Sequence, residues 1–116
     1  MDIKYHEITK AKGTEDFVLV NKKKYAIRFT PKHAEHIWDN YPDVLHNIKH
    51  REILTMLVKK AIIVEKNTNP LVCLAKFKNK VYETYVNIAE DRMEVMTSFR
   101  SNKQNYIDLY KKYEQN

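Results

Sequence analysis

Four of the five histidines in this 116-residue chain lie between residues 33 and 50. An imidazole can give or take a proton at neutral pH, because its ordinary pKa is about 6.5. His50 lies at the centre of the apolar stripe of a predicted helix, near the helix start, where a pocket could reach it. We predict His50 as a general acid or base; a hydrogen-bonded core histidine is the equal alternative. For His33 and His36, on an earlier predicted helix, the alternative is an ordinary surface position.

Arginine is scarce in this chain, with four residues among 21 basic side chains. Its guanidinium binds phosphate through two parallel hydrogen bonds, which a lysine ammonium cannot do. Arg100 ends a predicted strand beside Ser98, and Arg51 follows His50. A base, a fixed cation and a hydroxyl around one phosphate can cleave RNA without a metal. The catalytic candidates are therefore His50, Arg100, His33 and Ser98, and a surface salt bridge is the alternative for each arginine.

A second set of residues has the character of a nucleic-acid surface. Tyr85 falls on the polar face of a predicted strand, where bases can stack on an exposed aromatic ring. Lys76 and Lys78 share a strand face and could follow a phosphate backbone. Cross-strand packing of Tyr85 and protection of a strand edge by the lysines are the alternatives. The candidate nucleic-acid-binding residues are Tyr85, Lys76, Arg51 and His36.

Several common chemistries are excluded by composition. The single cysteine, Cys73, excludes an intrachain disulfide and a cysteine-based zinc site, and its apolar neighbours predict a core position. The single glycine, Gly13, excludes glycine-rich phosphate loops and dinucleotide fingerprints. His33 and His36 could share a metal, but no carboxylate pattern completes a zinc signature around them. We expect neither a metal nor a cofactor.

The polar candidates need a sheet to position them, and the C-terminal half of the chain predicts one. Three runs rich in Val, Tyr, Thr and Ile alternate in polarity, which is typical of half-buried antiparallel strands. They are Leu71–Lys78, Val81–Ala89 and Met93–Phe99, preceded by a strand at Ala61–Lys66. Strict alternation places Met93, Val95, Thr97 and Phe99 on one face of the last strand, and Met96, Ser98 and Arg100 on the other.

Helices are predicted before and after these strands along the chain. Thr30–Pro31 reads as a cap followed by proline at the first helical position, and Ser101–Gln104 reads as a capping box. We predict helices near residues 31–40, 49–60 and 102–113, and a hairpin from Phe17–Val20 and Tyr25–Phe29. The predicted fold class is α+β: two helices followed by a four-stranded antiparallel β-meander and a C-terminal helix, with an N-terminal β-hairpin, in a single domain over residues 1–116.

This order of elements resembles the phage- and mobile-element-associated branch of the barnase, EndoU, colicin and RelE-like ribonucleases. The resemblance covers roughly residues 28–100 and is carried by Thr30–Ile37, His50–Lys60 and a last strand that ends Val95–Met96–Thr97–Ser98–Phe99–Arg100. It implies RNA cleavage without metal on one sheet face. The helical histidines, Tyr85, and Arg100 with Thr97 or Ser98 match it. No well-placed glutamate base is evident, and Glu83 is the possible counterpart of the one in barnase.

The function expected from these observations is that of a metal-independent ribonuclease, toxin-like or phage-associated. The alternatives are a non-enzymatic phage or mobile-element protein that binds nucleic acid or a protein such as an antitoxin or host factor, and a plain structural domain. The formal charge of +6 is compatible with a polyanionic partner, for which we expect RNA over DNA. The polar N-terminal residues and lone cysteine predict a cytoplasmic protein without a membrane span.

Overall fold

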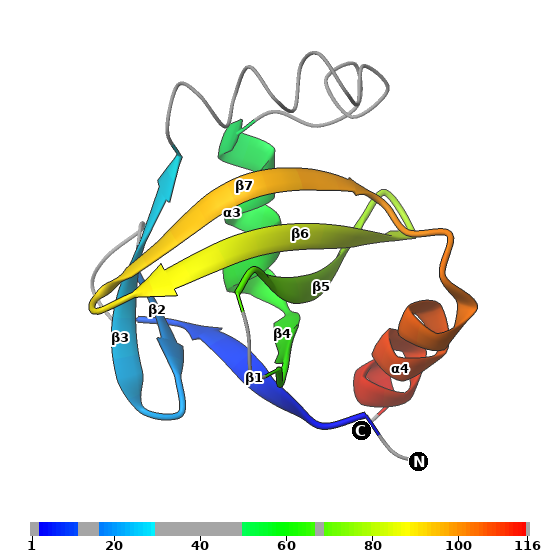
Figure 1. Cartoon of the computed structure of the whole chain (residues 1–116). Helices are drawn as coiled ribbons and strands as arrows, with labels where there is room; N and C mark the ends of the chain where they lie inside the picture. Colours follow the sequence, from blue (N-terminus) through cyan, green and yellow to red (C-terminus); the bar gives the residue numbers. More distant parts are fainter. Residues whose placement is uncertain (1–2, 12–16, 30–49, 67–68, 116) are drawn as a thin grey trace.

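The computed structural model describes residues 3–11, 17–29, 50–66 and 69–115, and within them the chain forms a closed barrel of seven strands with two helices (Figure 1). Around the barrel the strands follow the order β1-β2-β3-β7-β6-β5-β4, and β4 pairs with β1 to close it. Neighbouring strands are antiparallel except β3 and β7, which are parallel. The strands are β1 Tyr5–Lys10, β2 Phe17–Val20, β3 Lys23–Phe29, β4 Ala61–Val64, β5 Leu71–Phe77, β6 Lys80–Ala89 and β7 Arg92–Arg100.

The predicted fold class, two helices followed by a four-stranded meander, is wrong. Strands β4 to β7 do follow one another in antiparallel order, but they form one side of a barrel that β1, β2 and β3 complete. Strand β1 was not predicted, because only Ile8 of its six residues is buried and no apolar alternation marks the segment. Closure leaves no free strand edge for aggregation, which a four-stranded sheet would have. The helix predicted near residues 31–40 lies outside the described residues.

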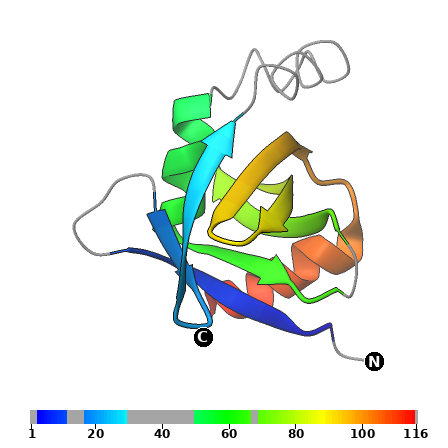
Figure 2. The same cartoon turned by 60° about the vertical axis from the view of Figure 1, so that its left-hand side comes forward.

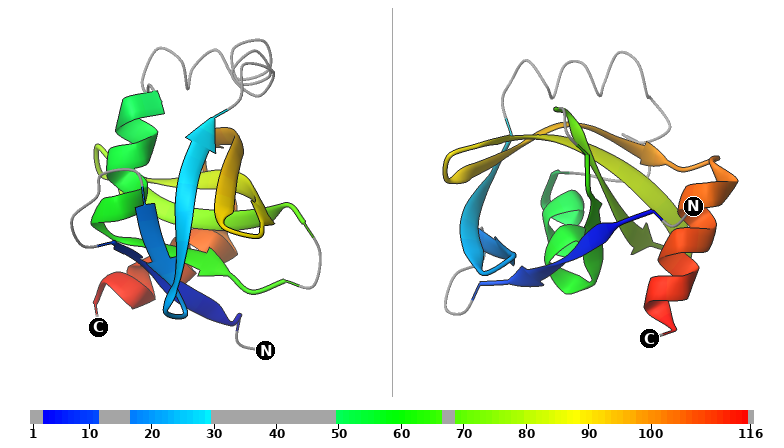
Figure 3. Two further views of the ribbon diagram at one scale, coloured as in Figure 1. Left: turned by 90° about the vertical axis from the view of Figure 1, so that its left-hand side faces the viewer. Right: turned by 60° about the horizontal axis from the view of Figure 1, so that its bottom comes forward.

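Helix α3, His50–Lys59, fills the barrel from one opening. Its buried residues Ile53, Met56 and Leu57 belong to the same apolar core as the inward-facing Val18 and Val95. Figure 2 shows α3 on one side of the barrel and the end of β4 on the opposite side, and the right-hand view of Figure 3 shows the helix within the ring of strands. The amphipathic stripe predicted for residues 49–60 is therefore the face that closes the core.

Helix α4, Gln104–Glu114, packs outside the barrel against β4 and β5 (Figure 1). The helix buries Tyr106, Tyr110 and Tyr113. Because β4 and β5 are covered by the interior on one face and by α4 on the other, both strands read as continuous apolar runs rather than alternating ones. Within β5, Cys73 is fully buried, and burial raises the pKa of its thiol to about 12.

A β-bulge in β7 changes which residues face the interior. Tyr85 of β6 lies opposite Thr97, but the next residue, Val86, lies opposite Val95, so Met96 is the extra residue. The predicted face assignment is therefore wrong beyond Met96. Directly opposite residues share a face, so Ser98 comes to lie on the same face as Val95.

The free energy of unfolding is expected to fall at alkaline pH, because the buried Tyr110 of α4 is stabilised as the neutral phenol. The Tyr110 hydroxyl donates to the Lys60 carbonyl at 2.7 Å, and burial, with a smaller effect of Glu114, raises its pKa from 10.0 to about 12. Folding favours the neutral phenol, so this contribution is complete below pH 10 and is lost as the pH rises to 12. We predict that the urea midpoint falls across this window, and falls less in Tyr110→Phe, which should be about 1 kcal/mol less stable at pH 7. The control is Tyr25→Phe; an equal alkaline decline in all three proteins would contradict the prediction.

Candidate nucleic-acid interface

Two adjoining pockets, of about 260 and 290 Å³, lie where α3 ends, where β5 turns into β6, and beside the last turns of α4. They share Lys76, Asn79 and Glu114. Seven basic side chains and one acidic side chain line them. We call this set the basic surface: Lys59, Lys60, Lys76, Lys78, Lys80, Arg100, Lys111 and Glu114. Such a concentration of positive charge gives a field that attracts anions.

A tight turn between β5 and β6 presents the central lysines. Lys78 and Asn79 both have positive φ, 50° and 66°, as required of the two central residues in a two-residue hairpin loop whose twist matches its strands. The turn lies one residue earlier than the predicted Asn79–Lys80. Lys76, Lys78 and Lys80 are exposed around it, so three lysines crowd one hairpin end.

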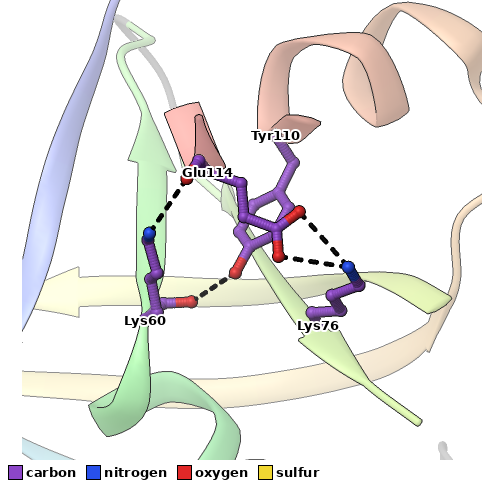
Figure 4. Close-up of polar contacts among 4 residues, drawn as sticks. All are labelled: Lys60, Lys76, Tyr110 and Glu114. Atoms are coloured by element: carbon purple, nitrogen blue, oxygen red, sulfur yellow. Dashed lines mark hydrogen bonds and ion pairs between the residues drawn. The ribbon is translucent and has the colours of Figure 1, made fainter. Parts of the chain in front are cut away.

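Glu114 connects two lysines of the basic surface, Lys60 and Lys76, to the end of α4 (Figure 4). The two oxygens of its carboxylate accept hydrogen bonds from Lys76 Nζ at 3.1 and 3.3 Å. Its main-chain carbonyl accepts one from Lys60 Nζ at 3.2 Å, while the Lys60 carbonyl accepts the Tyr110 hydroxyl at 2.7 Å. These bonds fix the end of α4 to both β5 and the segment between α3 and β4, and the lysines also complement the negative end of the helix dipole.

A buried carboxylate lies next to this surface. Glu83 is fully buried; Tyr85 Oη donates to its Oε1 at 2.6 Å and Ser101 Oγ donates to its Oε2 at 2.8 Å. Lys103 Nζ lies 3.8 Å from Oε1. A carboxylate out of water needs such partners, because isolated burial of a charge is very costly. The face of β6 predicted to meet solvent or a ligand thus contains an internal network that joins β6 to the start of α4.

The capping box predicted at Ser101–Gln104 does not form. Helix α4 begins at Gln104, with Lys103 at the N-cap and no side-chain cap hydrogen bond. The Ser101 hydroxyl instead donates to Glu83 and accepts the Lys103 main-chain N–H at 3.2 Å. The Ser101 hydroxyl does not cap α4 because it bonds to the buried Glu83 carboxylate of β6 instead.

The structure brings together only part of the predicted site. Arg100 and Lys76 line the same 260 Å³ pocket. Arg51 is exposed in the first turn of α3. Ser98 is fully buried, and its hydroxyl is 2.9 Å from that of Thr84, so it belongs to the barrel interior.

The remaining predicted residues have other surroundings. Tyr85 is half-buried and stacks on Phe99 with ring centroids 5.8 Å apart, which is the packing alternative considered for it. His50 is the first residue of α3, and its side chain lies outside the described structure, as do His33 and His36 entirely. The catalytic role of His50 and His33 and the nucleic-acid-binding role of His36 stay predictions. Sequence reasoning missed Lys59, Lys60, Lys111 and Glu114, which have no distinctive spacing along the chain.

No metal centre or membrane helix is found in the part of the chain that the structure describes. There, no group of three or more histidine, cysteine, aspartate or glutamate residues is arranged to hold a metal ion. No helix within those residues is long and apolar enough to cross a membrane. Comparison with known proteins gives no match to a family model, a curated protein or a solved structure. The function must therefore be argued from the surfaces themselves.

The Glu83 network gives a test of this part of the structure. Replacing Glu83 with alanine leaves the Tyr85 and Ser101 hydroxyls without their acceptor, and we expect a loss of about 3 kcal/mol in the free energy of unfolding. Glu83→Gln retains one carbonyl acceptor and should lose less. Urea denaturation measures both, with the exposed Glu90→Ala as the control. A Glu83→Ala protein as stable as the control would show that the network is not formed.

Proposed function

We propose that this protein binds nucleic acid, RNA in preference to DNA, through phosphate contacts on the basic surface. The observation that carries the proposal is the convergence of seven basic side chains from three separate parts of the chain around two adjoining pockets. The preference for RNA rests on the sequence motifs that resemble those of ribonucleases, Thr30–Ile37, His50–Lys60 and the end of β7, and not on the order of elements, which the structure corrects. A cytoplasmic location is part of the proposal, because a lone free cysteine is typical of proteins from reducing compartments.

An extended polyanion suits this surface better than a single small anion. The pockets adjoin and share lining residues, so successive phosphates of one strand could occupy both. Each phosphate neutralised by lysine or arginine releases condensed counterions, which makes the affinity strongly dependent on salt. The Glu114 carboxylate forms an ion pair with Lys76 Nζ at 3.1 Å. A phosphate that binds this lysine must therefore compete with that carboxylate.

The binding proposal predicts a loss of both affinity and salt dependence when basic residues are removed. Lys76→Gln combined with Arg100→Gln should weaken binding to single-stranded RNA about tenfold and reduce the salt slope by about 1 or more. Fluorescence anisotropy from low to physiological salt measures both. The control is Lys22→Gln combined with Arg28→Gln, which removes the same types of charge from β3 and the turn before it. Equal losses in the two proteins would show that only net charge matters.

Removing the charge of Glu114 should change the RNA affinity in the opposite direction in the same assay. Glu114→Gln frees Lys76 and should tighten RNA binding about threefold, the size expected for one partly exposed ion pair. Glu90→Gln makes the same change of net charge at the turn between β6 and β7. If Glu90→Gln tightens binding as much as Glu114→Gln does, the basic surface is not the binding site.

Metal-independent RNA cleavage is the second candidate function. It is favoured by the position of Ser101, which lines a pocket with Arg100 while its hydroxyl is bonded to the Glu83 carboxylate. A cation and a carboxylate-linked hydroxyl at one pocket are groups that phosphate chemistry uses. They add Glu83 and Ser101 to the predicted His50 and His33, whereas the predicted Ser98 is excluded by its burial in the barrel interior.

The catalytic candidate predicts cleavage of single-stranded RNA in the presence of EDTA. Arg100→Ala and His50→Ala should each reduce the rate about a hundredfold, because each removes a cation or a proton-transfer group. His36→Ala should have much less effect. Each variant is first shown to be folded by circular dichroism. If the parent protein binds RNA but leaves it intact, the enzyme candidate fails and the binding function stands.

A further inference from the structure

A third pocket, of about 170 Å³, is lined by residues at the end of β4 and the start of β5. Figure 2 shows the end of β4 on the side of the barrel opposite α3. Its apolar lining includes Val20, Ile63, Leu71 and Ile88, which come from four different strands. This pocket is separate from the basic surface and shares no lining residue with it. An apolar pocket with a few convergent polar groups is the usual form of a small-molecule site.

The volume of the pocket limits what it can hold. A cavity of about 150 Å³ lined by apolar side chains is large enough for benzene, whereas pockets for drug-sized ligands begin near 300 Å³. The pocket therefore takes one six-membered ring. Tyr25 lines it with an aromatic ring, and Lys23 Nζ lies 5.3 Å from the centroid of that ring. A ring held in the pocket would meet the aromatic side chain of Tyr25.

The polar side chains at the rim of the pocket favour a ring that carries hydrogen-bonding groups. His6, Glu65 and Lys66 line it, and His6 Nε2 lies 4.0 Å from a carboxylate oxygen of Glu65. The Lys66 side chain donates hydrogen bonds, the carboxylate oxygens of Glu65 accept them, and the two nitrogens of the His6 imidazole add further hydrogen-bonding positions. A ring that carries carbonyl acceptors and N–H donors along one edge matches this rim, and a purely hydrocarbon ring does not.

We infer that this pocket binds a pyrimidine base, uracil or cytosine, belonging either to a free nucleotide or to a nucleotide of single-stranded RNA. The ring lies against Tyr25 and the apolar lining, with a carbonyl oxygen toward Lys66 and the N3–H of uracil, or the amino group of cytosine, toward Glu65. Unstacked bases in single-stranded RNA are commonly held in this way, by aromatic stacking and edge hydrogen bonds. The inference deepens the proposed function and rests on it for the RNA-bound case.

Nuclear magnetic resonance titration separates the base from the phosphate. Uridine 5′-monophosphate should shift the backbone amides of Val20, Ile63, Leu71 and Ile88, and those of the basic surface. Ribose 5-phosphate, which lacks the base, should shift the basic surface alone, and adenosine 5′-monophosphate should shift the pocket residues much less. Uridine monophosphate that leaves the pocket amides unmoved overturns the inference. If single-stranded oligoadenosine still shifts the basic surface, the proposed function survives that result; if it does not, both fail.

Oligonucleotides distinguish the two sources of the base. If RNA supplies it, the protein should bind oligouridine about tenfold more tightly than oligoadenosine of equal length, and Leu71→Trp, which fills the pocket, should abolish the difference. Leu109→Trp makes the same substitution at a half-buried leucine of α4 and should retain it. Thermal melting checks that both variants fold. Equal binding of the two oligonucleotides, together with pocket shifts by uridine monophosphate, assigns the pocket to the free nucleotide. Equal binding without those shifts excludes the pyrimidine pocket.

Discussion

The packing of three tyrosines of α4 against β4 and β5 is the interaction on which both the fold and the basic surface depend. Tyr106, Tyr110 and Tyr113 cover the outer face of two strands whose inner face is already in the barrel core. Burial of each aromatic ring is favourable by a few kcal/mol, so the helix is held along most of its length. The Tyr113 hydroxyl also donates to Glu7 of β1 at 3.0 Å, which connects the helix to the strand that closes the barrel.

The charged groups of the basic surface follow from this packing. Once Tyr110 is buried, its hydroxyl reaches the Lys60 carbonyl, and the last turn of α4 is brought to Lys60 and Lys76. Glu114 then supplies the negative charge that lets these ammonium groups lie close together. Apolar packing thus positions the helix, and ion pairs arrange the charges that remain exposed.

The sequence predicts those elements whose signals are local. Alternating polarity and apolar stripes can be recognised within a few residues. They therefore predicted the strands β5, β6 and β7 and the helix α4. The barrel was not visible, since its closure depends on the pairing of Tyr5–Ile8 with Ala61–Val64 and on the parallel pairing of β3 with β7. The bulge at Met96 reversed the expected face of Ser98, because one extra residue changes the phase of a two-residue repeat. Arg100 and Lys76 were found by residue type, but their lysine neighbours converge only in three dimensions.

The parallel pairing of β3 with β7 sets the order in which the parts of the molecule can form. Ala26 pairs with Arg92, so the first three strands acquire this neighbour only after the chain has closed a very long loop, a slow and entropically costly step. The residues of the basic surface all lie between Lys59 and Glu114, in a stretch built from consecutive hairpins and one helix. The walls of the small apolar pocket come from both sides of the closure, with Val20 and Tyr25 on one side and Leu71 and Ile88 on the other. The basic surface therefore needs only the C-terminal half of the chain, whereas the small pocket exists only in a molecule whose barrel has closed.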